Sequence, residues 1–493
     1  NKYLGPESYA IIYKREGKDP DEQKIAAPKI TPIVTNRDSQ SEFLSEIQTS
    51  QVQPIEPVFV DYKKDMSQFE AQPGIDVLYK KNETNDIFTL IYVFNTGTEN
   101  DPALNLAFNY LSYLGTDKMT AEEIASEMYD IACSFYMNAG ANQSSIQITG
   151  LSENMGKAME IVEGLIAGAK PDEAILENCK ADMLKSRADA KLNQSRCFGA
   201  LQRYLFYGGD FIRRTTLTDP ALQALTSEQL LAKIGGLMGK QHEVLYYGPQ
   251  KEAEVKSALA EHHKVAADLQ PLEKKFSTLL PTDANKVVLA QYDAKQLYYL
   301  QFSNRGEKFD VAADPEITLY NEYFGGGMNT IVFQEMREAR GLAYTAWATL
   351  ATPSNANGDY SYYAFIATQN DKMQKAVEAF DDIINNMPES EKAFGIAKEA
   401  LVSRLRTERT VKDGVLWSYL RARDLGLDAP RDKQIFEKVQ SMTLDDVKAA
   451  QQKWVKGRKY VYGILGDIQD LDLNYLKTLG PIQTVSQEEI FGY

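Results

Sequence analysis

The feature that most constrains the fold of this chain is an internal repeat with a period of about 218 residues. Residues 146–155 read as a strand that runs into a helix, and residues 363–373 repeat that pattern one period later. Residues 225–230 and 442–447 each open a helix with a threonine ahead of acidic or amide residues, which is typical of a helix N-terminus. The repeat predicts two consecutive domains that share one plan.

The order of elements in the repeat predicts the fold class. Residues 86–94 and 296–302 are matching β-rich runs, and residues 242–248 and 459–466 are matching strands that follow the repeated helix. Each domain should contain two strands, helices, two strands, several helices, one strand and a last helix. Such a plan predicts an α+β fold in which helices cover an antiparallel sheet.

The domain limits follow from composition. The two repeated domains span residues 58–270 and 284–470, with Pro271 and Pro281 flanking the boundary. Residues 15–57 are polar and rich in proline, as linkers are, and a helix is expected near residues 39–47. Residues 1–14 hold one apolar run, 9–13, which we expect to be the terminal strand of a preceding domain, since a lone strand cannot bury its faces. Residues 471–493 are expected to form a C-terminal tail with a short helix.

Charge and composition exclude several classes of protein. The 493 residues carry a net charge of −15, which disfavours nucleic acid and anionic membranes as partners. No run of about 18 apolar residues is present, so no membrane span is predicted. The three cysteines, Cys133, Cys179 and Cys197, are odd in number and lack the spacing of a zinc clip, so we interpret them as small core residues.

The stretch from residue 323 to residue 348, YFGGGMNTIVFQEMREARGLAYTAWA, has the most distinctive pattern in the chain. A glycine run, 325–327, predicts a tight turn with close backbone approach, because neither the P-loop lysine nor a βαβ context accompanies it. The apolar residues Met328, Ile331, Val332 and Met336 predict one buried helix face.

The end of this stretch brings two polar side chains into one region. Gly341 is expected to stop the helix, and residues 344–350 are expected to form a strand. Arg337 near the helix end and Tyr344 at the strand's start can therefore point at one spot. Taken alone, each of the two is more often a surface arginine or a plain strand aromatic.

This stretch resembles the pitrilysin, insulinase and mitochondrial-processing-peptidase family of zinc metallopeptidases (inverzincins), over roughly residues 58–470. In that family a GGGM-like turn precedes a helix ending in R-x-x-R-G-L-A-Y or a close variant. The family's arginine and tyrosine, seven residues apart in the non-zinc half, fall here on Arg337 and Tyr344. The resemblance implies a LuxS/MPP-like metallohydrolase fold.

The family's zinc motif, H-x-x-E-H on a helix, is missing from the positions where the resemblance places it. Counting back from Gly115, these positions hold Leu106, Asn109 and Tyr110. The matching helix of the second domain, near residues 315–323, has no histidine. The chain's three histidines are His242 at a strand's start and the adjacent His262 and His263, which a helix points about 100° apart. We predict that this chain binds no metal and no other cofactor.

The resemblance implies the C-terminal, non-zinc half of a pitrilysin-like zinc metalloendopeptidase. Zinc, the general base and the attacking water belong to the N-terminal half, which is either part of the same parent chain or a separate subunit. The half described here would close over an unfolded peptide or polypeptide, with Arg337 and Tyr344 binding substrate and stabilising the oxyanion. Without the zinc half, this chain is expected to be inactive. The compartment expected from long-chain bacterial relatives is the periplasm or cell envelope.

Two alternatives belong to other classes of function. Family members without zinc also serve as structural or assembly subunits of a respiratory complex. The second alternative is a module of the same fold that binds peptides without catalysing a reaction. Retention of Arg337 and Tyr344 favours the peptidase, because a scaffold does not require this pair.

Overall fold

The computed structural model describes residues 3, 5, 7–13, 41–51 and 53–493. The chain divides into two units, Asn1–Pro54 and Ile55–Tyr493. In the first unit, α1 (Glu42–Thr49) begins after Ser41, whose hydroxyl accepts a hydrogen bond from the Leu44 amide. The expected linker lies mostly outside the described residues. Residues 9–13 form no strand in this unit and are exposed, so their pairing with a preceding domain stays a prediction.

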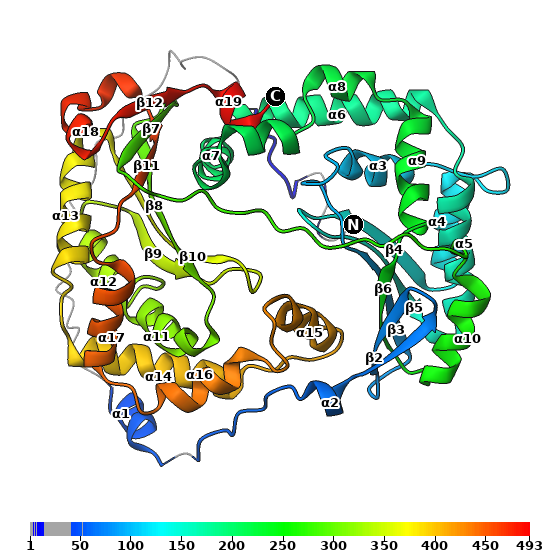
Figure 1. The fold of residues 1–493 in the computed structure, drawn as a ribbon, viewed down its shortest axis with the longest axis horizontal. Coiled ribbons are helices and arrows are strands. Elements are labelled where there is room, and N and C mark those ends of the chain that lie inside the picture. Colours follow the sequence, from blue (N-terminus) through cyan, green and yellow to red (C-terminus); the bar gives the residue numbers. More distant parts are fainter. Residues whose placement is uncertain (1–2, 4, 6, 14–40, 52) are drawn as a thin grey trace. The chain divides into compact units, whose positions relative to one another are not determined.

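The first domain of the larger unit begins with the short helix α2 (Tyr62–Asp65) and a six-stranded sheet in the order β1-β2-β6-β3-β5-β4 (Figure 1). Its strands are β1 (Ser67–Gln72), β2 (Ile75–Lys81), β3 (Ile87–Phe94), β4 (Cys133–Ala139), β5 (Ser144–Leu151) and β6 (His242–Gly248). Its remaining helices are α3 (Leu104–Leu111), α4 (Ala121–Asp130), α5 (Met155–Gly168), α6 (Glu173–Lys191), α7 (Gln194–Thr215), α8 (Asp219–Ala224), α9 (Ser227–Met238) and α10 (Glu252–His262).

The second domain repeats this plan, with a sheet in the order β12-β7-β11-β8-β10-β9. Its strands are β7 (Lys286–Gln291), β8 (Gln296–Lys308), β9 (Thr345–Ala351), β10 (Asp359–Gln369), β11 (Val461–Gly466) and β12 (Ile482–Val485). Its helices are α11 (Asp314–Phe324), α12 (Ile331–Phe333), α13 (Met373–Asn385), α14 (Glu391–Thr407), α15 (Gly414–Asp424), α16 (Arg431–Val439), α17 (Leu444–Ala450), α18 (Leu473–Leu479) and α19 (Gln487–Phe491). The predicted α+β class with two repeated domains is confirmed.

The sheets are mixed rather than purely antiparallel. β6 lies parallel to β2, and β11 lies parallel to β7, while β12 adds a further parallel pair at the edge of the second sheet. A strand that returns after a long helical crossover can enter a sheet in the parallel direction, which a hairpin cannot do. The sequence pattern identified these strands but did not reveal their direction.

Helices cover both faces of each sheet. One face of the first sheet packs against α3, α4, α5 and α9, and the corresponding face of the second sheet packs against α11, α13, α14 and α17. The other face of each sheet packs against a helix that belongs to the other domain. Phe198 and Leu201 of α7 pack on the second sheet, and Leu416 and Leu420 of α15 pack on the first. This reciprocal packing ties the two domains to each other.

The C-terminal residues belong to the second domain rather than to a polar tail. β12 pairs with β7, and Val485 and Ile490 are buried. The three cysteines are free and buried, as predicted for core residues. Among the helices of the described residues, none combines the length and the apolar character that a membrane crossing requires.

Candidate functional site

The glycine turn joins α11 to the stretch that carries Arg337. The Ala348 amide of β9 donates a hydrogen bond of 3.0 Å to the Gly325 carbonyl. A Cβ atom on Gly325 would collide with the carbonyl oxygen of Ala348, so only glycine permits this approach. The predicted close backbone approach is therefore confirmed for the first glycine of the run.

The helix after the turn is short and ends in a widened turn. Residues Gln334–Ala339 are π-helical, and the Arg340 amide donates to the Glu335 carbonyl at 3.1 Å, five residues back. Gly341 then adopts a positive φ of 58° and ends the helix, as predicted. Such π-turns recur at functional sites because they shift side chains relative to a regular α-helix.

One part of the predicted helix face is wrong. Ile331, Val332 and Met336 are buried as expected, but Met328 is 72% exposed. The helix begins only at Ile331, so Met328 lies in the preceding turn, where the 3.6-residue period does not apply. Its carbonyl accepts a hydrogen bond of 2.6 Å from the Gln334 side chain, which ties the turn to the helix.

Arg337 and Tyr344 are in direct contact. The guanidinium carbon of Arg337 lies 4.7 Å from the centre of the Tyr344 ring and 5.0 Å from the centre of the Phe333 ring. A guanidinium between two aromatic rings is held by cation–π attraction, which is worth about 0.5–1 kcal/mol per ring at an exposed site. Glu338 contributes a looser ion pair at 3.6 Å. The sequence placed Arg337 and Tyr344 near one spot but gave no role to Phe333.

The Tyr344 side chain is 72% exposed, and within the described residues its hydroxyl makes no hydrogen bond. The phenol is thus anchored by its ring and presents its O–H to solvent. Arg340, three residues after Arg337, is occupied instead by two ion pairs. The one to Asp382, at 2.9 Å, attaches the helix end to α13, and the one to Glu335, at 3.4 Å, lies within the same helical stretch. Within the part of the chain that the structure describes, the Tyr344 hydroxyl is therefore free to meet a ligand, and Arg337 is held less tightly by carboxylates than Arg340.

The three positions where the resemblance places the zinc motif lie on α3. Leu106 and Tyr110 are buried, whereas Asn109 is exposed. The Tyr110 hydroxyl lies 2.8 Å from the Ser227 hydroxyl and accepts a hydrogen bond of 2.7 Å from the Asp172 amide. These residues tie α3 to neighbouring helices through apolar packing and a tyrosine hydrogen-bond network.

Two of the three histidines meet in the core of the first domain. The Nε2 atoms of His242 and His263 are 2.9 Å apart, and His263 Nδ1 lies 2.6 Å from Glu163 Oε1. Tyr92 also donates to Glu163, at 2.8 Å. His262 points away from this cluster and pairs with Glu160 at 3.3 Å, consistent with the divergence predicted for adjacent helix residues.

Hydrogen-bond partners define the protonation of this cluster. His242 Nδ1 lies 2.8 Å from the Lys240 carbonyl, which can only accept, so the Nε2 atom of the neutral His242 ring accepts a hydrogen bond from His263 Nε2. His263 Nδ1 and Glu163 Oε1, 2.6 Å apart, form the next hydrogen bond of the cluster. Burial, followed by the neighbouring His263, lowers the pKa of His242 to about 4. Sequence reasoning missed this cluster, although Glu163 among the apolar positions of α5 was a sign of a buried partner.

The second domain carries a related polar cluster one period later. Asp381 on α13 corresponds to Glu163, and Tyr460 beside β11 corresponds to His242. Gln301 of β8 is fully buried without a hydrogen-bond partner in the described residues, and the Tyr460 hydroxyl likewise has none. Burial raises the pKa of Asp381 to about 6. The two domains thus carry polar side chains at the same positions of the repeat, a glutamate and a histidine in the first and an aspartate and a tyrosine in the second.

Comparison with known proteins finds one family whose model matches part of the chain. Residues 241–401 match the peptidase M16 inactive domain. The chain is 23% identical over 312 residues to an uncharacterised zinc protease of Rickettsia bellii, covering 61% of this chain and 70% of that protein. The structure of a peptidase M16 inactive domain from Pseudomonas fluorescens superposes with a TM-score of 0.64 at 18% identity, covering 82% of this chain and 98% of that one.

A longer protein shows the same fold. The periplasmic protease PqqL of Escherichia coli superposes with a TM-score of 0.62 at 14% identity, and the similarity covers 90% of this chain and 49% of PqqL. The chain therefore spans about half of that protease.

Proposed function

We propose that this chain is a non-zinc, inactive-domain half of the peptidase M16 family and that it completes a pitrilysin-like zinc endopeptidase, as the similarity of residues 241–401 to the peptidase M16 inactive domain supports. It closes over an unfolded peptide held against a zinc-binding N-terminal half. Zinc in that other half activates the attacking water. The chain described here supplies Arg337 and Tyr344, and it is inactive alone.

The Tyr344 hydroxyl donates a hydrogen bond to the oxyanion that forms when water attacks the scissile carbonyl. The observation that carries this role is the exposed phenol whose ring rests on the Arg337 guanidinium, 4.7 Å away. Because this hydroxyl has no partner among the described residues, it exchanges hydrogen bonds with water only, and breaks none within the protein, when it turns to substrate. Donors of this kind contribute about 2.7–4 kcal/mol to the transition state.

Arg337 acts in two ways in this proposal. Its guanidinium holds the Tyr344 ring in place and adds positive charge beside the developing oxyanion. Its remaining N–H groups can bind carbonyl oxygens of the peptide, because the ion pair to Glu338, at 3.6 Å, leaves the other N–H groups free. Phe333, whose ring centre lies 5.0 Å from the guanidinium, positions Arg337 rather than contacting substrate.

The N-terminal residues supply the contact with the zinc half. Tyr9, Ile11, Ile12 and Tyr13 are between 64% and 90% exposed, which is unusual for apolar side chains in one run. They form the terminal strand of a sheet in the zinc half, where the alternating faces of a strand become buried. The periplasmic location of PqqL supports the same compartment for this chain.

The test is cleavage of an unstructured peptide by the zinc half, either mixed with this chain or within the longer parent chain. Wild type is compared with Tyr344→Phe, Arg337→Ala and Arg337→Lys, and with Tyr129→Phe as a control that removes an equally exposed hydroxyl. We expect kcat to fall tenfold or more for Tyr344→Phe and not for the control. Zinc-dependent cleavage that is unchanged by all three site variants would refute the site assignment. No cleavage by the two halves together would favour a scaffold.

A further inference from the structure

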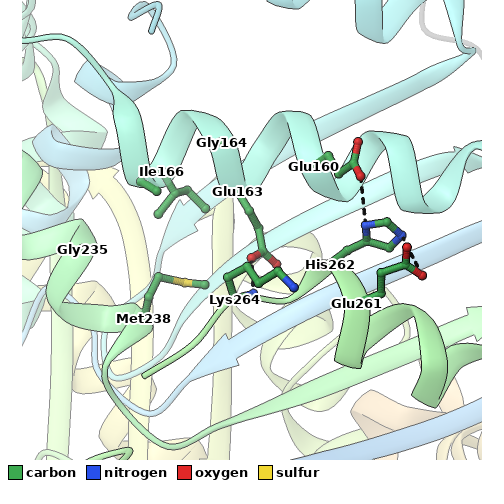
Figure 2. A pocket seen from close by; sticks show the side chains of 10 residues that line it. Glu160, Glu163, Gly164, Ile166, Gly235, Met238, Glu261, His262 and Lys264 are labelled. Atoms are coloured by element: carbon green, nitrogen blue, oxygen red, sulfur yellow. Dashed lines mark hydrogen bonds and ion pairs between the residues drawn. The ribbon is translucent and has the colours of Figure 1, made fainter. Parts of the chain in front are cut away.

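An open cavity of about 410 Å³ lies on the first domain, between α5, α9 and the C-terminal end of α10 (Figure 2). Ile166 of α5 and Met238 of α9 line its apolar part. Arg337 and Tyr344 lie on the second domain, so this cavity is a separate feature of the chain.

Backbone forms part of the walls on both sides. Gly164 of α5 and Gly235 of α9 line the cavity, and a Cβ atom on either would meet no atom of the described residues within 4 Å. Alanine in a helix interior is favoured over glycine by about 1 kcal/mol. Packing therefore does not require glycine at these two positions, and its presence keeps the cavity open.

Carboxylates gather at one end of the cavity. Glu160 and Glu261 flank His262, with N···O distances of 3.3 Å and 3.9 Å, and their side chains are 57% and 72% exposed. Glu163, only 7% exposed, forms the inner wall. Tyr92 and the Lys264 amide donate hydrogen bonds to its carboxyl group, and His263 Nδ1 lies 2.6 Å from it. Figure 2 shows Ile166 and Met238 at one end of the cavity, Glu160 and Glu261 at the other, and the Lys264 side chain between them. Three carboxylates against one lysine leave the charge of the lining negative.

We propose that this cavity binds a lysine or arginine side chain of a peptide. The aliphatic stem lies along Ile166 and Met238, and the cationic head meets the carboxylates of Glu160 and Glu261. The net charge of −15 favours the approach of basic peptides. This binding goes beyond the proposed catalytic role, because it requires neither the zinc half nor Tyr344.

The test measures binding of a capped pentapeptide with one lysine between two leucines to the full chain, by ligand-observed NMR. A matched peptide with norleucine in place of lysine keeps the stem and removes the charge. We expect the lysine peptide to bind about fivefold more tightly than the norleucine peptide. That factor corresponds to the free energy that two exposed ion pairs contribute. Glu160→Gln combined with Glu261→Gln should reduce that preference to less than twofold.

The location is tested by filling the cavity. Gly164→Leu and Gly235→Leu place a side chain in it, whereas Gly168→Leu and Gly236→Leu place the same side chain on the same helices at open positions that do not line it. We expect Gly164→Leu and Gly235→Leu to weaken binding at least fivefold, and the two control variants to bind like wild type with similar melting temperatures. Equal binding by all four variants, or equal binding of the lysine and norleucine peptides, would overturn the proposal.

Discussion

Removal of the His242 imidazole should flatten the pH dependence of stability in the first domain. His242 is buried, its Nδ1 donates to the Lys240 carbonyl, and its Nε2 accepts from His263. A proton added to His242 would have no acceptor and would lie beside the other imidazole. His242→Asn retains a donor for the Lys240 carbonyl and removes the titrating group.

The magnitude follows from the pKa of His242, which burial lowers from 6.5 to about 4. The unfolded chain binds this proton more readily, so the free energy of unfolding is fully retained above pH 6.5 and declines as pH falls towards 4. At pH 5 the loss relative to pH 8 is about 2 kcal/mol, and it approaches about 3.4 kcal/mol below pH 4. Asp381 acts in the opposite sense, because a raised pKa makes the folded second domain more stable as pH falls.

Hydrogen exchange measures this effect where it arises. Peptides from β6 report the opening free energy of the first domain at pH 8 and pH 5, after correction for the intrinsic exchange rate. Wild type should lose about 2 kcal/mol between these pH values, and His242→Asn should lose less than half of that. His262→Asn removes a histidine outside the cluster and serves as the control. Equal losses in wild type and His242→Asn would refute the reasoning.

Two further predictions concern the candidate site. Phe333→Leu removes one ring from the Arg337 guanidinium and should lower kcat about twofold to fivefold, with Phe333→Tyr restoring it, as measured by peptide cleavage with the zinc half. An unchanged kcat in Phe333→Leu would show that the ring does not position Arg337. Gly325→Ala places a methyl group against the Ala348 carbonyl and should destabilise the chain by about 1–3 kcal/mol in urea unfolding, whereas Gly326→Ala has room and should cost less than about 1 kcal/mol. Equal losses in both glycine variants would contradict the packing argument.

The repeat made much of the fold predictable, because the same strand and helix patterns occur in both domains. Strand β5 followed by α5, and β10 followed by α13, appeared in the sequence as apolar alternation followed by helical periodicity. Thr226 and Thr443 cap the helices that the repeat predicted. Directions of strands were not predictable, since the parallel pairing of β6 with β2 depends on contacts about 165 residues apart.

The candidate site was predictable only in part. Arg337 and Tyr344 are seven residues apart around one turn, so their proximity follows from local geometry. The contact between His242 and His263, in contrast, depends on how the end of α10 returns against β6. Phe333 lies four residues before Arg337, a helical spacing at which side chains meet, so this contact was available from the sequence. Met328 was misplaced because the helix begins three residues later than its apolar pattern suggested.

The most direct measurement of the central claim compares transition-state binding with rate in one variant. A phosphinic peptide, which mimics the tetrahedral intermediate, is titrated against the assembled enzyme carrying wild-type Tyr344 or Tyr344→Phe. If the Tyr344 hydroxyl stabilises the oxyanion, the inhibitor should lose the same factor, tenfold or more, that kcat/KM loses, while a substrate-like peptide keeps its affinity. An inhibitor that binds equally well to both enzymes would contradict the account.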